Sequence, residues 1–130
     1  IRHRGEEVGL CKIRPIGAIT KGEEGEQMAD IGEMKKAGAV AISDDGKTVK
    51  SSRLMRLAME YASGFNMRCL CHCEDKELAD GGVVNEGYNS TLAGLKGIPR
   101  AAEDVVIARE ICLSESLGVP AMSRRTAACA

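Results

Sequence analysis

The chain has 130 residues, of which 44% are hydrophobic, and its 18 basic and 19 acidic residues leave a net charge of −1. This balance argues against the strongly basic surface that binds nucleic acids or anionic membranes, and an aromatic content of 2% argues against base-stacking platforms. No apolar run approaches the roughly 18 residues needed to cross a bilayer. We therefore expect one domain of ordinary size, with neither nucleic acid nor a membrane as partner.

The first half of the chain alternates short apolar runs with amphipathic stretches. Residues 13–19 form a candidate strand, and residues 27–37 form a candidate helix with Met28, Ile31 and Met34 along one face. The continuous apolar run at residues 39–42 is typical of a strand buried on both faces. These patterns predict a strand, a helix and a second strand.

A loop carrying Asp44 and Asp45 follows, and Ser51 or Ser52 can serve as the N-cap of the next helix, which ends at Gly64. Residues 67–71 then form a strand with His72 at its C-terminal end. We expect a helical turn at residues 74–79 and a long glycine-rich loop, with at most a short helix, at residues 81–97.

Pro99 opens the last predicted helix, which Gly118 ends. Its buried side is expected to hold Val106, Ile107, Ile111 and Leu117. The repeated order of strand and helix predicts an α/β fold with a parallel sheet of about three βα units. Since a complete eight-unit barrel needs about 250 residues, these units form either part of a (β/α)8 barrel or a small open sheet.

Two groups able to carry chemistry follow consecutive predicted strands. In parallel α/β folds, catalytic groups collect beyond the C-terminal ends of the strands, and the Asp44–Asp45 pair and His72 occupy such ends. Carboxylate and imidazole are both good zinc ligands. The plainer interpretations are that Asp-Asp-Gly is a common turn and that a single strand-end histidine caps a neighbouring backbone group.

Six cysteines lie in the chain, and Cys69, Cys71 and Cys73 form the densest cluster of metal-binding residue types, together with His72. Because side chains alternate along a strand, the three cysteines are expected to face the helix layer as small buried apolar groups, opposite His72. No C-x-x-C pair occurs, which disfavours a zinc ribbon or a redox site. We expect mostly reduced thiols and a cytoplasmic setting.

Several segments of the chain resemble, in order, the dihydroorotases of the larger bacterial type I class, which belong to the amidohydrolase superfamily. The matching segments are residues 15–22 (PIGAITKG), 38–46 (GAVAISDDG), 72–75 (HCED), 82–87 (GVVNEG) and 97–99 (GIP), followed by Ala102-Glu103 and Ala108-Arg109. The resemblance runs from about residue 7 to residue 120. We therefore expect residues 1–120 to be the central part of a metal-dependent amidohydrolase barrel, and residues 121–130 to be a tail that departs from the family pattern.

The resemblance implies a (β/α)8-barrel enzyme of pyrimidine biosynthesis that interconverts carbamoyl aspartate and dihydroorotate. Enzymes of this family use two zinc ions, which generate the nucleophile and polarise the amide carbonyl. Asp45 falls on the position of the family's metal-bridging aspartate and His72 on that of the next ligand, while Asp44 is expected to be a loop acid or to orient a ligand. A homo-oligomer or a complex with aspartate transcarbamoylase is the expected assembly.

The chain also departs from the family pattern. It has no counterpart of the first-strand His-x-His motif, of the sixth-strand histidine or of the eighth-strand aspartate that serves as general base, so no catalytic residue is assigned. We expect an internal piece of a longer enzyme that is inactive by itself. The alternatives are a hydantoinase or allantoinase, which a lysine in place of Asp45 would have favoured, and a non-catalytic partner of aspartate transcarbamoylase.

Overall fold

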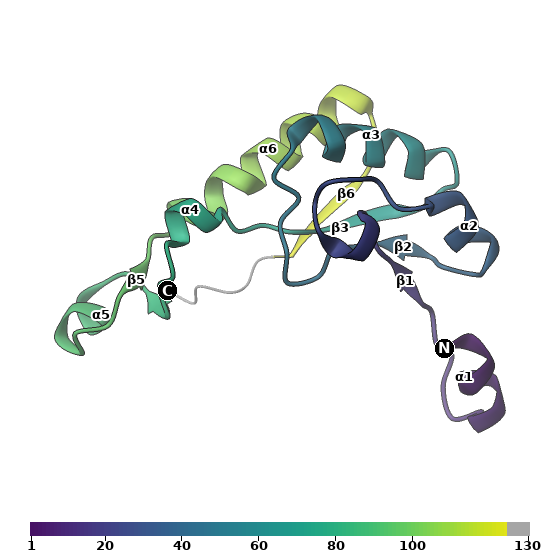
Figure 1. The fold of residues 1–130 in the computed structure, drawn as a ribbon, viewed down its shortest axis with the longest axis horizontal. Coiled ribbons are helices and arrows are strands. Elements are labelled where there is room, and N and C mark those ends of the chain that lie inside the picture. Colours follow the sequence, from purple (N-terminus) through teal and green to yellow (C-terminus); the bar gives the residue numbers. More distant parts are fainter. Residues whose placement is uncertain (125–130) are drawn as a thin grey trace.

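The computed structural model describes residues 1–124, arranged around a central parallel sheet with two smaller projections at opposite ends (Figure 1). In chain order, the elements are α1 (Arg2–Val8), β1 (Ile16–Gly17), the 3-10 helix η1 (Lys21–Glu23), α2 (Ile31–Lys36), β2 (Ala41–Ile42), α3 (Ser52–Ser63), β3 (Arg68–His72), α4 (Lys76–Ala79), β4 (Val84–Asn85), α5 (Tyr88–Leu92), β5 (Gly97–Ile98), α6 (Ala101–Leu117) and β6 (Ala121–Arg124). The predicted α/β class is confirmed.

The central sheet has the strand order β1-β2-β3-β6, and every neighbouring pair of strands is parallel. Ile16 pairs with Ala41 across the first two strands, and Ile42 pairs with Cys69 across the next two. This sequential order of parallel strands is that of one arc of a (β/α)8 barrel. It brings the C-terminal ends of β1, β2 and β3 to one edge of the sheet.

Helices α2, α3 and α6 cover one face of this sheet (Figure 1). The core between sheet and helices is built from Ile31 of α2, Ile42 of β2 and Met55 and Met59 of α3, all of which are buried. Helix α3 begins where the sequence predicts, because the Ser51 side chain accepts a hydrogen bond from the Leu54 amide at 3.2 Å. The helix layer therefore fixes one face of the sheet and leaves the strand ends accessible.

Several predicted elements are shorter in the structure than in the sequence pattern. The strands expected at residues 13–19 and 39–42 are reduced to β1 and β2, the helical turn expected at 74–79 to α4, and the helix expected from residue 27 begins only at Ile31. The start of that helix is delayed by a turn in which the Lys21 amide donates to the Gln27 carbonyl at 2.8 Å and the Ala29 amide donates to the Ile19 carbonyl at 2.9 Å. These backbone bonds compete with the first turn of the helix.

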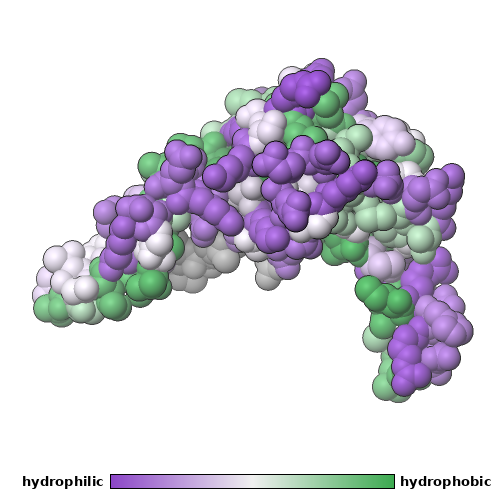
Figure 2. Space-filling view, viewed as in Figure 1, coloured by the Kyte–Doolittle hydropathy of each residue, from purple (hydrophilic) through white to green (hydrophobic). Residues whose placement is uncertain are grey.

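The glycine-rich segment at residues 81–97, expected to be mainly a loop, forms a small projecting arm (Figure 1). Its strands β4 and β5 pair in parallel and enclose α5. Figure 2 shows apolar surface along this arm, where Val83 and Leu92 are exposed. The segment therefore has more regular structure than its composition indicates.

The region after α6 also differs from expectation, since the sequence pattern predicts three strands and the structure has a fourth beside β3. Strand β6 pairs with β3 from Ala121 to Arg124, so the first four residues of the tail predicted at 121–130 continue the sheet. Residues 125–130, the rest of that tail, lie outside the described residues. Within residues 1–124, no helix is both long and apolar enough to cross a membrane.

Helix α6 is placed as predicted, but its buried face is rotated relative to the expected one. Val106 is buried, whereas Ile111 is 50% exposed and Glu110 is only 3% exposed. The buried line along the helix runs through Ala102, Val106 and Glu110 at four-residue spacing. The expectation for Ile111 is therefore wrong, because a charged side chain holds the inward position at that turn.

Candidate metal centre

A cavity of about 260 Å³ lies at the C-terminal edge of the central sheet. Its lining includes Gly17 from β1, Ser43 after β2 and Leu70 from β3, together with Asp45 and His72. The two predicted metal ligands therefore come from the ends of neighbouring strands and face one cavity, which is where parallel α/β folds place their functional groups.

Asp44 and Asp45 are adjacent in sequence, but the structure gives them different environments. Asp44 is 1% exposed, and its Oδ1 accepts hydrogen bonds from the Ile19 amide at 2.7 Å and the Thr20 amide at 3.0 Å. Its Oδ2 accepts a further hydrogen bond from the Thr20 hydroxyl. Asp44 therefore links the loop after β2 to the segment after β1 through hydrogen bonds, and its carboxylate does not line the cavity.

Asp45 is exposed and lines the cavity. The chain turns immediately after it, with Gly46 at φ 74 and the Lys47 amide donating to the Asp44 carbonyl at 2.8 Å. A positive φ of this size favours glycine, because a Cβ atom is strained in that conformation. The turn thus directs two successive carboxylates to opposite environments, with Asp45 on the cavity side.

Ser43 holds the end of β2 in register on both sides. Its amide donates to the Gly17 carbonyl of β1 at 2.8 Å, and its hydroxyl donates to the Leu70 carbonyl of β3 at 2.8 Å. The sequence offers no signal for this residue beyond its place before the acidic pair. Ser43 joins the three strand ends from which the cavity is built.

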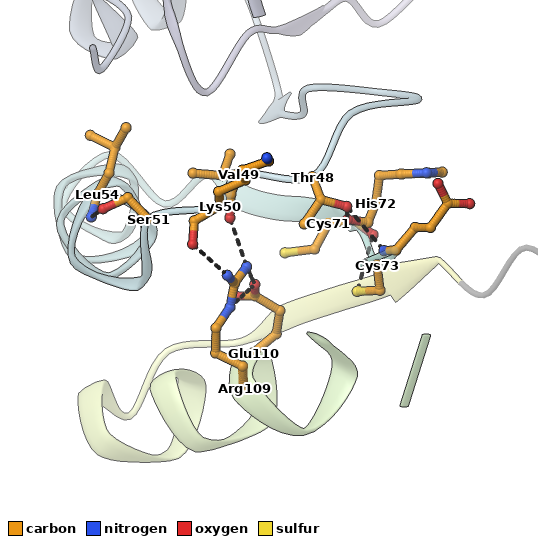
Figure 3. Close-up of polar contacts among 11 residues, drawn as sticks. Thr48, Val49, Lys50, Ser51, Leu54, Cys71, His72, Cys73, Arg109 and Glu110 are labelled. Atoms are coloured by element: carbon orange, nitrogen blue, oxygen red, sulfur yellow. Dashed lines mark hydrogen bonds and ion pairs between the residues drawn. The ribbon is translucent and has the colours of Figure 1, made fainter. Parts of the chain in front are cut away.

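His72 is the last residue of β3, and it points away from the side chains of Cys71 and Cys73 (Figure 3). It is half-buried and lines the cavity. Cys69, Cys71 and Cys73 are buried in the core, and Cys71 also contributes to the lining of the cavity. The predicted alternation along this strand is confirmed. The cysteine cluster and the histidine therefore belong to opposite faces of the sheet.

Burial makes the strand cysteines poor nucleophiles. It raises the pKa of Cys69 to about 12, with a smaller contribution from the negative charge of Glu110, and it raises the pKa of Cys71 as well. Since the thiolate is the form that binds metals and attacks electrophiles, these cysteines act as apolar core groups. Cys69 and Cys71 are free thiols in the structure.

The donor set at the cavity fits part of a zinc site. A carboxylate and an imidazole are both suitable zinc ligands, and catalytic zinc sites use three protein ligands. Among residues 1–124, no group of three or more His, Cys, Asp or Glu side chains could hold a metal ion. Asp45 and His72 would therefore be two members of a larger ligand set.

Comparisons with known proteins agree with this architecture. The family described as dihydro-orotase-like matches residues 1–121. The chain is 58% identical over 120 residues to a dihydroorotase of Acetivibrio thermocellus, with 92% of this chain and 28% of the relative covered. It is 51% identical over 117 residues to a dihydroorotase of Pelobacter propionicus (90% and 28% covered) and 54% identical over 110 residues to one of Pelotomaculum thermopropionicum (85% and 26% covered).

The chain thus spans between a quarter and a third of the length of these curated relatives. The family match covers all the strands that line the cavity, including the loop with Asp45 and the strand with His72. The parallel sheet, the cavity at its C-terminal edge and the family match lead to one assignment. The chain belongs to the dihydroorotase-like family.

Proposed function

We propose that this chain is the part of a zinc-dependent dihydroorotase that supplies two of its metal ligands, Asp45 and His72. The observation that carries the proposal is that both side chains line one cavity at adjacent strand ends, within a segment that matches the family from residue 1 to residue 121. The burial of Asp44 supports Asp45 as the ligand of the acidic pair. Residues 1–120 would form the central part of the barrel, with residues 121–130 departing from the family pattern.

The proposed reaction is the interconversion of carbamoyl aspartate and dihydroorotate, a step of pyrimidine biosynthesis in the cytoplasm. Zinc bound at such a site lowers the pKa of a water ligand and polarises a carbonyl group. The residues of this chain would contribute negative charge from Asp45 and a neutral donor from His72. An aspartate in place of a lysine supports dihydroorotase over hydantoinase or allantoinase.

The 130-residue chain by itself is proposed to be inactive. Two protein ligands fall short of the three that a catalytic zinc site uses, and no general base is assigned among the residues that line the cavity. The isolated chain should therefore show no turnover of carbamoyl aspartate or dihydroorotate when zinc is added. A kcat near ordinary enzyme values, on the order of 1–1000 per second, would contradict this.

A chimera tests the proposal at the length of the relatives. Residues 1–120 of this chain would replace the matching segment of the Acetivibrio thermocellus dihydroorotase, and ring opening of dihydroorotate and zinc content would be measured. We expect an active, zinc-loaded chimera, and hydantoin and allantoin serve as comparison substrates. A chimera that does not open the dihydroorotate ring, or that hydrolyses hydantoin in its place, would contradict the assignment to dihydroorotase.

Two ligand variants and one control sharpen that test. Asp45→Asn and His72→Gln should each lower kcat/KM by more than about 100-fold, since loss of groups that merely orient the ligands already costs about 10–100-fold. Asp80→Asn is the matched control, because Asp80 lies far along the chain with an exposed ion pair to Lys96. Full activity in Asp45→Asn and His72→Gln would overturn the ligand assignment.

A further inference from the structure

The loop between β2 and α3 carries Asp45, and its far end is joined to the strand that carries His72. The Thr48 hydroxyl donates to the His72 carbonyl at 2.8 Å (Figure 3). The Glu74 amide donates back to Thr48 Oγ1 at 3.0 Å. Thr48 thus continues the pairing between the two chain segments beyond the end of β2. One side chain connects the loop bearing one proposed ligand to the backbone of the other.

The same loop is held from a third element, helix α6. Arg109 donates from Nη1 to the Lys50 carbonyl at 3.1 Å and from Nη2 to the Val49 carbonyl at 2.9 Å (Figure 3). The guanidinium group presents several donors in a rigid planar fork, which suits two successive carbonyl groups. Because both acceptors are backbone atoms, Arg109 fixes the path of the loop and not one of its side chains.

Glu110 fixes the guanidinium group in turn. Its Oε1 accepts a hydrogen bond from Arg109 Nε at 3.0 Å and another from Nη2, and the pair is only 21% and 3% exposed. Glu110 Oε2 is buried without a hydrogen-bond partner among the described residues. Burying an ion pair in this way is a weak source of stability, so its clearest effect here is to hold Arg109 in one orientation.

We propose that Thr48 and Arg109, with Glu110 orienting Arg109, are positioning residues that fix the β2–α3 loop so that Asp45 faces His72 across the cavity. The part of this inference that concerns metal binding rests on the proposed function; the part that concerns loop order does not. The hydrogen bonds from Thr48 and Arg109 to the loop and strand all end on backbone atoms, so the clamp acts through the backbone. They form a clamp, defined as Thr48, Arg109 and Glu110.

Two variants open the clamp by independent routes. Thr48→Val keeps the side-chain shape and removes both hydrogen bonds to the end of β3. Arg109→Met combined with Glu110→Gln removes the donors to the loop without leaving a buried charge unpaired. Glu110→Gln alone is the reference for the double variant. Arg100→Met is the control, because Arg100 is the N-cap residue of the same helix and forms an exposed ion pair with Asp104.

Hydrogen exchange in the full chain measures the order of the loop. Thr48→Val should accelerate exchange of the Glu74 amide about tenfold, the change that corresponds to loss of one hydrogen bond. The double variant should accelerate exchange of the Lys47 amide, which donates to the Asp44 carbonyl within the loop, by a similar factor relative to Glu110→Gln. Exchange equal to the reference in both variants would overturn the inference.

Zinc binding by the chimera with the Acetivibrio thermocellus dihydroorotase, in which the rest of the ligand set is expected, provides the second measurement. Changes in the ring signals of His72 on addition of Zn²⁺ to the metal-free chimera, identified by comparison with His72→Gln, report this site. The clamp variants should bind Zn²⁺ about tenfold more weakly than their references, and Arg100→Met should not. Unchanged affinity in both clamp variants would refute the positioning role.

The two measurements separate failure of the inference from failure of the proposed function. If Zn²⁺ does not bind at His72 in the chimera without clamp substitutions, the proposed metal site is wrong, and the exchange rates alone decide whether the clamp orders the loop. If Zn²⁺ binds and both clamp variants retain its affinity, the metal site stands and the positioning role is refuted.

Discussion

Replacing Asp44 and Asp45 separately by asparagine tests whether Asp44 stabilises the fold while Asp45 binds the metal. Both substitutions remove one negative charge with almost no change in shape. Asp44 accepts three hydrogen bonds while buried, whereas Asp45 is exposed at the cavity. Asp44→Asn should therefore reduce the stability of the fold, and Asp45→Asn should act on metal binding.

The size of the effect at Asp44 follows from its three hydrogen bonds. A hydrogen bond to a charged group contributes about 1.5–3 kcal/mol and one between neutral groups about 0.5–1.5 kcal/mol. Removing the charge thus weakens each bond by about 1 kcal/mol, which gives a loss of about 3 kcal/mol in the free energy of unfolding. Exposed substitutions such as Asp45→Asn or Asp80→Asn should stay within about 0.5 kcal/mol of the parent.

Urea unfolding followed by circular dichroism measures these differences, with a common slope assumed for all variants. We expect the midpoint of Asp44→Asn to fall well below those of Asp45→Asn and Asp80→Asn. Zinc titration of the chimera carrying the same substitutions should give the reverse order, with Asp45→Asn the most affected. A loss below about 1 kcal/mol for Asp44→Asn, or equal losses at both aspartates, would refute the reasoning.

Three further predictions concern the packing around the site. Iodoacetamide should modify the exposed Cys112 rapidly and Cys69 only on unfolding, since Cys69 is buried with a raised pKa; mass spectrometry of the labelled peptides decides this, and equal labelling would contradict it. Ser51→Ala should lower the free energy of unfolding by about 1 kcal/mol through loss of the N-cap, with Ser52→Ala as the control in the same urea experiment. Burial raises the pKa of Glu110, so the folded state holds its proton more tightly than the unfolded state, and stability should fall as pH rises above the usual glutamate value of about 4.3. The stability of Glu110→Gln relative to the parent should therefore increase from pH 4 to pH 7, and a constant difference would contradict this.

The sequence predicts the elements that local physics determines. The continuous apolar run before Ser43 and the alternation from Cys69 to Cys73 identify two neighbouring strands and assign their faces correctly. The serine before α3 identifies the start of that helix. Because the ends of parallel strands meet at one edge of a sheet, the shared location of Asp45 and His72 follows from these assignments.

The features that the sequence does not reveal depend on contacts between distant segments. The turn that delays the start of α2 is made by hydrogen bonds between backbone groups. The buried face of α6 includes Glu110, although a charged side chain is usually expected on the exposed face of a helix. Thr48 and Arg109 bind backbone carbonyls of residues distant in the chain or on another element. Because a backbone carbonyl is present at every residue, hydrogen bonds of this kind cannot be predicted from a pattern of residue types.

Anomalous diffraction at the zinc edge, from crystals of the chimera with the Acetivibrio thermocellus dihydroorotase, tests the central claim most directly. The claim predicts a zinc peak within about 2.0–2.2 Å of both a carboxylate oxygen of Asp45 and a ring nitrogen of His72, with Asp44 still bonded to Thr20. A zinc peak bound through other residues, with Asp45 and His72 both away from it, would contradict the claim.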